Sequence, residues 1–135
     1  MIWRAGVDDV EKINGWLARD FPETPMDFGE VLSFERNVCL CEGEGGAVFV
    51  WRGPGIYEVH CFFEQRGAAV REISAAILAI IKRDHGAKMV WAAIPDASPK
   101  VKIYVRWLGF ESVDHAVFPH GPCEIFTWKG LSCHL

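Results

Sequence analysis

The chain has 135 residues, of which 50% are hydrophobic and 24% charged, and its formal net charge is −4 at pH 7. This length and composition are enough for one buried core, so residues 1–135 are expected to form a single domain. The acidic balance gives no support to nucleic-acid binding through a basic surface, and no apolar run is long enough for a membrane span. The start, MIWRAGVDDVEK, lacks the basic and then apolar order of a secretory signal, so we expect a cytoplasmic protein.

Cysteine and histidine do not follow the spacing of a disulfide framework or a metal site. The five cysteines are an odd number without close repeats, which favours reduced thiols. A zinc site needs convergent pairs such as CxxC, whereas Cys39 and Cys41 alternate within an extended run. We therefore expect no metal.

The N-terminal segment alternates between short elements and breaks. Residues 2–4 favour a short strand, and the helix after them can be capped by Asp8, with Glu11 three residues later. An apolar stripe follows in that helix, formed by Val10, Ile13 and Leu17. The proline-rich residues 21–27 interrupt the chain, and residues 28–36 indicate at most a turn or two of helix.

Three extended segments come next, at residues 37–42, 46–52 and 56–63. Glycine-rich breaks at residues 43–46 and 53–55 separate them. Short glycine turns between consecutive extended runs are typical of hairpins. The sequence therefore predicts an antiparallel meander.

A long helix is predicted after Gly67 and is expected to end near His85 and Gly86, because glycine is the usual residue after a helix. One apolar face runs along it, comprising Val70, Ile73, Ile77, Ile80 and Ile81. Residues 88–94 are continuously apolar, which predicts a central strand covered on both faces.

Ser98 can cap one more helix, with Pro99 at its first position and Gly109 at its end. Two last strands, residues 110–118 and 123–129, are joined by a turn. The order of elements predicts an α/β fold with a mixed sheet and at least one right-handed parallel crossover.

Two motifs resemble those of the GNAT superfamily of N-acetyltransferases, which depend on acetyl-coenzyme A (acetyl-CoA). QRGAAVRE resembles the family's pyrophosphate loop, and PDASPKVKIYVRWLGF resembles the helix that ends in the family's Gly-Phe. The resemblance implies a mixed, mostly antiparallel twisted sheet of about six to seven strands flanked by about four helices. It also implies acetyl-CoA as the acyl donor and an amine acceptor, on a small molecule or a protein, and leaves a homodimer open.

The first motif places small residues where a helix begins. A helix N-terminus exposes backbone N–H donors and the positive end of the helix dipole, and small residues let a diphosphate approach. The resemblance assigns the pyrophosphate to Arg66, Gly67, Ala68, Ala69, Val70 and Arg71. It assigns the pantetheine arm to the strand before them, at Cys61, Phe62 and Phe63, as if the arm were an added strand.

Arg71 occupies a position where the family usually has a small residue, and Ala69 stands at the second glycine position. Arg71 therefore either adds charge to the phosphate site or obstructs it. A solvated basic turn at a helix start is the structural alternative.

The second motif bears on proton transfer. Many family members place a tyrosine, as the acid for the departing thiolate, four residues before the Gly of Gly-Phe. That position is Val105 here, and Tyr104 lies one residue earlier, a rotation of about 100° on a helix. Tyr104 is thus either the acid or a core residue, and Ser98, where the family often has asparagine, is either a coenzyme contact or simply a helix cap.

Glu58 and His60 are the candidate bases. They lie on one face of the third meander strand, because side chains alternate with period two, and Glu58 resembles a glutamate that some family members use on this strand. A cross-strand polar pair or a half-buried histidine is the alternative. The leading hypothesis is an acetyl-CoA dependent N-acetyltransferase, against a non-catalytic module of the same fold or an acyltransferase with another acyl-CoA donor.

Overall fold

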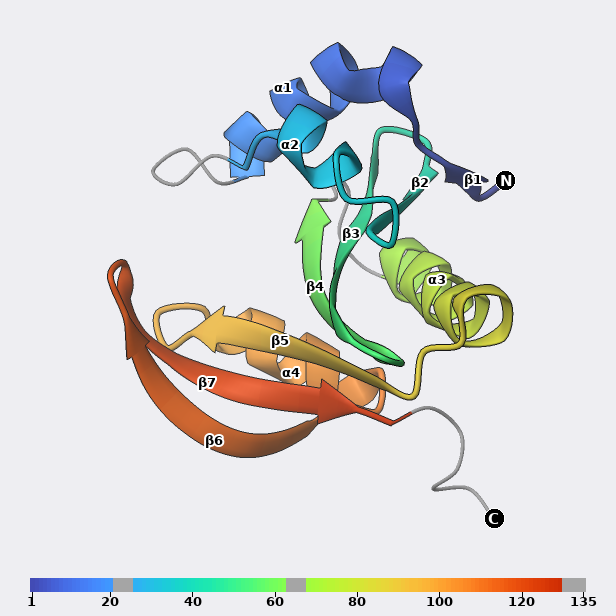
Figure 1. The fold of residues 1–135 in the computed structure, drawn as a ribbon. Helices are drawn as coiled ribbons and strands as arrows, with labels where there is room; N and C mark the ends of the chain where they lie inside the picture. Colours follow the sequence, from blue (N-terminus) through green and yellow to red (C-terminus); the bar gives the residue numbers. More distant parts are fainter. Residues whose placement is uncertain (21–25, 63–67, 130–135) are drawn as a thin grey trace.

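The structure is a computed structural model that describes residues 1–20, 26–62 and 68–129. Its strands are β1 Trp3–Arg4, β2 Val38–Glu42, β3 Gly45–Gly53, β4 Ile56–Phe62, β5 Met89–Pro95, β6 Glu111–Phe118 and β7 Gly121–Trp128. Its helices are α1 Val10–Asp20, α2 Phe28–Leu32, α3 Ala68–His85 and α4 Pro99–Trp107, with a short 3-10 helix, Val7–Asp9, leading into α1 (Figure 1).

The strands form one 7-stranded sheet in the order β1-β2-β3-β4-β5-β7-β6. Strands β1 to β4 pair antiparallel in sequence order, as the meander predicts, and β5 pairs antiparallel with β7. β4 and β5 pair parallel, and α3 is the crossover between them. The predicted mixed, mostly antiparallel sheet with flanking helices is confirmed.

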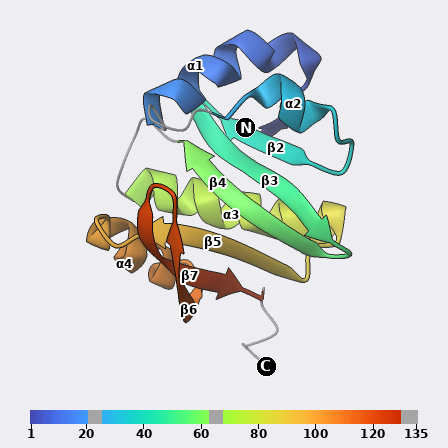
Figure 2. The ribbon, with the colours of Figure 1, turned by 60° about the vertical axis from the view of Figure 1, so that its left-hand side comes forward.

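The helices cover the two faces of the sheet unequally. α1 and α2 lie on one face over β2, β3 and β4, whereas α3 and α4 lie on the other face (Figures 1 and 2). The core beneath α3 and α4 joins them to β2–β5 and β7, with Phe49, Ile77, Ile81, Val90, Val105 and Phe126 among its buried members. The core beneath α1 and α2 includes Ile13, Leu17, Phe28, Val48 and Phe62. The face of β5, β7 and β6 opposite α4 has no helix over it in the part of the chain that the structure describes (Figure 1).

The predicted cap of the first helix is wrong in detail. Asp8 lies inside the 3-10 helix rather than ahead of a helix, and the N-cap position belongs to Gly6. The Asp9 carboxylate accepts the Gly6 backbone N–H at 2.9 Å. The N-cap therefore lies two residues earlier than predicted, because the chain forms a 3-10 turn before α1, and the side chain that reaches back to the N-cap is Asp9.

β5 is central in the sheet, but the prediction that both its faces are covered is wrong. Val90, Ala92 and Ile94 are buried, and the residues that alternate with them are half-buried. The helices α3 and α4 cover one face of β5, and α1 and α2 do not extend over the other (Figure 2). The continuous apolar run at residues 88–94 therefore corresponds to a strand that helices cover on one face only.

The boundaries of the other elements follow the turn residues. Gly43 and Gly86 have φ of 61° and 69°, and they follow β2 and α3 as the sequence predicts. The Asp27 carboxylate caps the short α2 by accepting the Gly29 N–H. Among the described helices, none has the length and apolar character that crossing a membrane requires.

Candidate functional site

β4 and β5 begin as a parallel pair and then separate. Their register runs through Ile56↔Met89, Tyr57↔Val90 and Glu58↔Trp91 and goes no further within the described strands. Beyond that point, β4 from Val59 onward pairs with β3, and β5 from Ala92 onward pairs with β7. Two strand edges therefore face each other across a gap, each with backbone N–H and C=O groups that the other strand does not satisfy.

A cavity of about 580 Å³ lies at this separation. Its walls come from both strands and from the helices on the α3 and α4 face, with α1 contributing Arg19. The wall residues on β4 and β5 are Val59, His60, Cys61, Ala92, Ala93, Ile94 and Pro95, and those on α3 and α4 are Ser74, Ile77, Leu78, Val101, Tyr104 and Val105. The lining is mainly apolar with a few polar groups, which is typical of a ligand site.

The N-terminus of α3 lies beyond the end of β4. Phe63, Arg66 and Gly67, three of the predicted coenzyme contacts, lie outside the described residues. Ala68 begins α3, Ala69 is exposed, and Val70 is buried in the core. Cys61 and Phe62, the other predicted contacts on β4, end that strand, with Phe62 buried beneath α1.

Arg71 is held by α4. Its guanidinium group lies over the indole ring of Trp107, which is 62% exposed. Stacking on an aromatic face orients a guanidinium and leaves its edge donors available. Arg71, in the first turn of α3, therefore contacts α4 through Trp107.

The hydroxyl group of Tyr104 faces α3. It lies 2.6 Å from Ser74 Oγ and donates to the Val70 carbonyl oxygen at 3.1 Å. Val105, at the position where the resemblance places a tyrosine, is buried and also lines the cavity. Of the α4 side chains that line the cavity, Tyr104 is therefore already bonded to α3, and Val105 is apolar.

Ser98 stands at the N-cap position of α4, but its hydroxyl makes no capping hydrogen bond. Its backbone has φ −119° and ψ 63°, away from the extended geometry that aims an N-cap hydroxyl at the helix N–H groups. Its carbonyl oxygen accepts the Val101 and Lys102 N–H groups instead. The side-chain cap that the sequence predicts is wrong, and Ser98 is a polar residue of the cavity wall.

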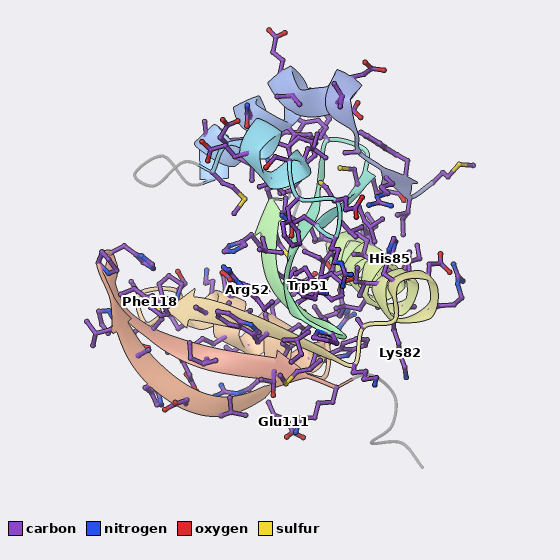
Figure 3. The ribbon with its side chains drawn as sticks, in the orientation of Figure 1. Trp51, Arg52, Lys82, His85, Glu111 and Phe118 are labelled. Atoms are coloured by element: carbon purple, nitrogen blue, oxygen red, sulfur yellow. The ribbon has the colours of Figure 1, made fainter. Side chains whose placement is uncertain are left out.

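Glu58 and His60 lie on the same face of β4, as period two predicts, and they are joined. His60 Nε2 is 2.7 Å from Glu58 Oε2. The other oxygen, Oε1, accepts Arg52 Nε at 2.8 Å and also Arg52 Nη2. Arg52 follows Trp51 near the end of β3 (Figure 3).

The pKa of Glu58 is set by opposing effects. Burial is the largest and raises the pKa, because it disfavours the charged form. Hydrogen bonds and charge from His60 and Arg52 act in the other direction and together outweigh it, so the net pKa lies below the ordinary value. Glu58 is therefore a carboxylate near neutral pH.

Cys61 presents its side chain to the cavity, and the residue is exposed to solvent there. The surrounding protein nevertheless raises the pKa of its thiol to about 12, because the thiolate would be poorly solvated. Cys61 is thus an accessible thiol in its protonated form.

Arg52 and Ser74 are the site residues that sequence reasoning missed. Arg52 could have been found, because it and Glu58 are oppositely charged and flank the glycine-rich turn of one hairpin. Ser74 carries no comparable signal, since it meets Tyr104 through the packing of α3 against α4.

A second group of polar side chains lies at the far end of β5. Asp96, His115 and Glu124 have ligand-type atoms within 4.8 Å of one another. The Lys102 ammonium group lies 2.6 Å from Asp96 Oδ1 and 3.1 Å from Glu124 Oε1. The Lys102 ammonium group places positive charge between the two carboxylates, so Asp96, Lys102 and Glu124 form an ion-pair network.

The chain has the GNAT fold, in which β4 and β5 separate beside the N-terminus of the central crossover helix. A chimera of the spermidine N-acetyltransferase SpeG of Vibrio cholerae and hSSAT superposes with a TM-score of 0.79 at 11% identity, over 96% of each chain. The aminoglycoside acetyltransferase AAC(6′)-Ib, solved with coenzyme A and kanamycin, superposes with a TM-score of 0.72 at 14% identity, over 99% of this chain and 96% of the other. The same enzyme with ribostamycin and coenzyme A gives a TM-score of 0.72 at 14% identity, over 99% and 95%.

No protein-family model matches the sequence, and a search among curated proteins finds no match. At identities of 10–14% the likeness establishes the fold. What the site does is therefore argued from its own residues.

Proposed function

We propose that the protein is an N-acetyltransferase that moves an acetyl group from acetyl-CoA to a primary amine. The observation that carries the proposal is the separation of β4 and β5 beside a cavity of about 580 Å³. A linear arm with amide groups can pair with a strand edge as an added strand, and the pantetheine arm of coenzyme A has two such amides. The neighbouring structures solved with coenzyme A support this choice of ligand.

In this proposal the pyrophosphate binds at the start of α3. The N–H groups in the first turn of α3 have no acceptor within the helix and can bind an anion, and the exposed Ala69 leaves room for its approach. Arg71 adds positive charge one turn later, with its guanidinium held on Trp107. The contribution of Phe63, Arg66, Gly67 and Ala68 remains a prediction, because their side chains lie outside what the structure describes.

The acetyl carbon then lies where the strands separate, near Glu58 and His60. The amine nitrogen attacks the thioester carbon, the C–N bond forms and the C–S bond breaks, with one proton leaving the nitrogen and one reaching the thiolate. Glu58 and His60 form the basic pair that receives the proton. The Tyr104 hydroxyl is the candidate donor of the other proton, and the Tyr104→Phe variant tests this role.

The acceptor is proposed to be a cationic amine. SpeG is named for spermidine, and AAC(6′)-Ib for aminoglycosides, and both ligands are amines. The net charge of −4 on this chain favours the approach of such a cation.

Calorimetric titration with acetyl-CoA, with desulfo-CoA and ATP as comparison ligands, tests the proposal. We expect specific binding of acetyl-CoA and then acetylation of at least one amine in a panel that includes spermidine and kanamycin. Gly67→Val should weaken coenzyme binding at least about tenfold by crowding the helix start, whereas Gly6→Val, at a glycine with nothing within 4 Å of an added Cβ, should not. A folded protein that binds no acetyl-CoA at millimolar concentration would refute the proposal.

A module that binds coenzyme A without catalysis is the second candidate. The observation in its favour is that the Tyr104 hydroxyl is bonded to Ser74 and Val70, with Val105 at the position of the family's tyrosine. Tight binding with no transfer to any amine would favour it. Transfer from propionyl- or succinyl-CoA but not from acetyl-CoA would instead indicate another acyl donor.

A further inference from the structure

We propose that Arg52 is a positioning residue for the base of this site, in which Glu58 orients His60 and His60 takes the proton from the acceptor amine. The inference rests on the proposed function, since it divides roles within the same site. It assigns Arg52, on β3, to a task that the coenzyme-binding motifs do not imply.

The geometry shows a chain of three side chains across two strands. Arg52 binds Glu58 Oε1 through two of its nitrogens, and His60 Nε2 is 2.7 Å from Oε2. Each carboxylate oxygen therefore has its own partner. Because Arg52 fixes one edge of the carboxylate, the other edge is held towards the imidazole ring.

The exposed fraction of the side chain increases from Glu58 to His60 and then to Arg52. The Glu58 side chain is 12% exposed, that of His60 is 29% exposed, and that of Arg52 is 51% exposed. His60 also lines the cavity where the strands separate. The imidazole is consequently the member of the three that an acceptor in the cavity can reach.

Glu58 is poorly suited to take the proton itself. Its carboxylate already accepts hydrogen bonds from two cationic or potentially cationic groups, and these hold its pKa below the ordinary value despite burial. Protonating it would forfeit those bonds. A carboxylate so held is effective at fixing a neighbouring imidazole.

The contact also fixes the tautomer of His60. In the neutral ring, Nε2–H donates to the carboxylate, which places the lone pair of the ring on Nδ1. In the proposed step the imidazole ring gains the proton that the attacking nitrogen loses, the C–N bond forms, and the C–S bond breaks to give the thiolate. Glu58 then faces an imidazolium ion and stabilises it.

Arg52 also places a positive charge beside the Glu58 carboxylate. The other charged or titratable residues that line the cavity are Arg19 on α1, Cys61 on β4 and Tyr104 on α4. The Cys61 thiol is protonated near neutral pH, and Arg19 adds positive charge that the Arg52 variants leave in place.

The test compares Arg52→Gln and Arg52→Lys with the wild type, with Arg83→Gln as the matched control. Arg83 is an exposed arginine paired with Asp84 at the end of α3, so its variant removes the same charge and the same kind of contact elsewhere. We expect Arg52→Gln to lower kcat/KM about tenfold and to move the acidic limb of its pH profile upward by about half a unit or more. Arg52→Lys keeps the charge and should return the acidic limb most of the way to that of the wild type, and Arg83→Gln should change neither quantity.

Nitrogen-15 NMR of the His60 ring provides a readout that does not need activity. The ring signals are assigned by their loss in His60→Gln, and calorimetry and circular dichroism confirm coenzyme binding and folding of each variant. In Arg52→Gln we expect the tautomer balance of His60 and the pH dependence of its ring signals to change. Unchanged ring signals would overturn the inference, even if the wild type transfers acetyl groups. Changed ring signals in a protein that transfers nothing would refute the proposed function and leave the three-residue arrangement established.

Discussion

Tyr104 of α4 donates its hydroxyl hydrogen to the Val70 carbonyl oxygen of α3, 3.1 Å away, and the same hydroxyl lies 2.6 Å from Ser74 Oγ. Ser74 is 6% exposed, so its hydroxyl depends on this partner. The two helices that cover one face of the sheet are thereby joined beside the cavity. Tyr104, which the family resemblance makes a candidate acid, therefore links α3 and α4 through hydrogen bonds.

Tyr104→Phe is expected to lower the free energy of unfolding by about 1 kcal/mol, because it removes these hydrogen bonds and leaves the Ser74 hydroxyl without its partner. We expect kcat for acetyl transfer to fall less than about tenfold, since removing a general acid typically costs about 10²-fold or more. Urea unfolding and steady-state kinetics measure the two quantities. A loss of 10²-fold or more in kcat with unchanged stability would instead assign Tyr104 the acid role.

Ser74→Ala provides the control for that variant, because it removes the same hydrogen bond from the other side. The effects of Tyr104→Phe and Ser74→Ala on stability should not add. A double-mutant cycle should give a coupling energy of about 0.5–1.5 kcal/mol. A coupling energy near zero would contradict a stabilising hydrogen bond between Tyr104 and Ser74.

Gly46 on β3 is expected to tolerate no side chain. A Cβ built there would lie 2.4 Å from the Leu40 carbonyl oxygen and 2.9 Å from Cys41 Sγ. Gly46→Ala should therefore lower the free energy of unfolding by about 1–3 kcal/mol, because backbone must move to make room. Gly15→Ala is the control, since a Cβ at this position inside α1 meets nothing within 4 Å and should raise stability by about 0.5–1 kcal/mol. Equal midpoints of urea unfolding for the two variants would contradict the prediction.

Glu124 is expected to make stability depend on pH. A hydrogen bond from the Ser112 hydroxyl lowers the pKa of Glu124, and contacts with Lys102 and Arg106 lower it further. Because the folded pKa lies below the ordinary value of 4.5, the stabilisation is complete above that value and is lost as pH falls through the folded pKa. Glu124→Gln should be less stable than the wild type at pH 7, and the difference should shrink as the pH is lowered below 4.5. If the free energies of unfolding of the two proteins ran parallel from pH 7 to pH 3, the contacts of Glu124 would not contribute to the pH dependence of stability.

Local patterns predicted most of the fold. The glycine breaks gave the meander, the apolar stripe from Val70 to Ile81 gave α3, and period two placed Glu58 and His60 on one face of β4. These features depend on residues that are near one another in the sequence. Their physical causes are side-chain direction and turn geometry, which the sequence carries directly.

The arrangement of the site depends on longer-range packing and was not predictable in the same way. The separation of β4 and β5 after Glu58 is a relationship between two strands that the whole of α3 divides in the sequence. Ser74 and Tyr104 are 30 residues apart and meet through the packing of two helices. The failed side-chain cap at Ser98 has the same origin, because the backbone leading from β5 into α4 sets the direction of its hydroxyl.

Cys61 gives a chemical test of the coenzyme site that needs no turnover. Among the described cysteines it is the exposed one, whereas Cys39, Cys41 and Cys123 are buried. Desolvation raises the pKa of its thiol to about 12, which leaves little thiolate near pH 8, so iodoacetamide should modify Cys61 more slowly than a cysteine of ordinary pKa.

Saturating acetyl-CoA should slow that modification further, because the pantetheine arm would cover the edge of β4 where Cys61 lies. Mass spectrometry of a Cys133→Ser background follows the reaction at Cys61, since Cys133 lies outside the described residues. ATP at the same concentration is the control and should protect less, because it lacks the arm. Equal rates of modification with and without acetyl-CoA, in a protein shown by calorimetry to bind it, would mean that the arm follows another path. Protection by acetyl-CoA and not by ATP would place the arm along β4 independently of whether an acceptor amine has been found.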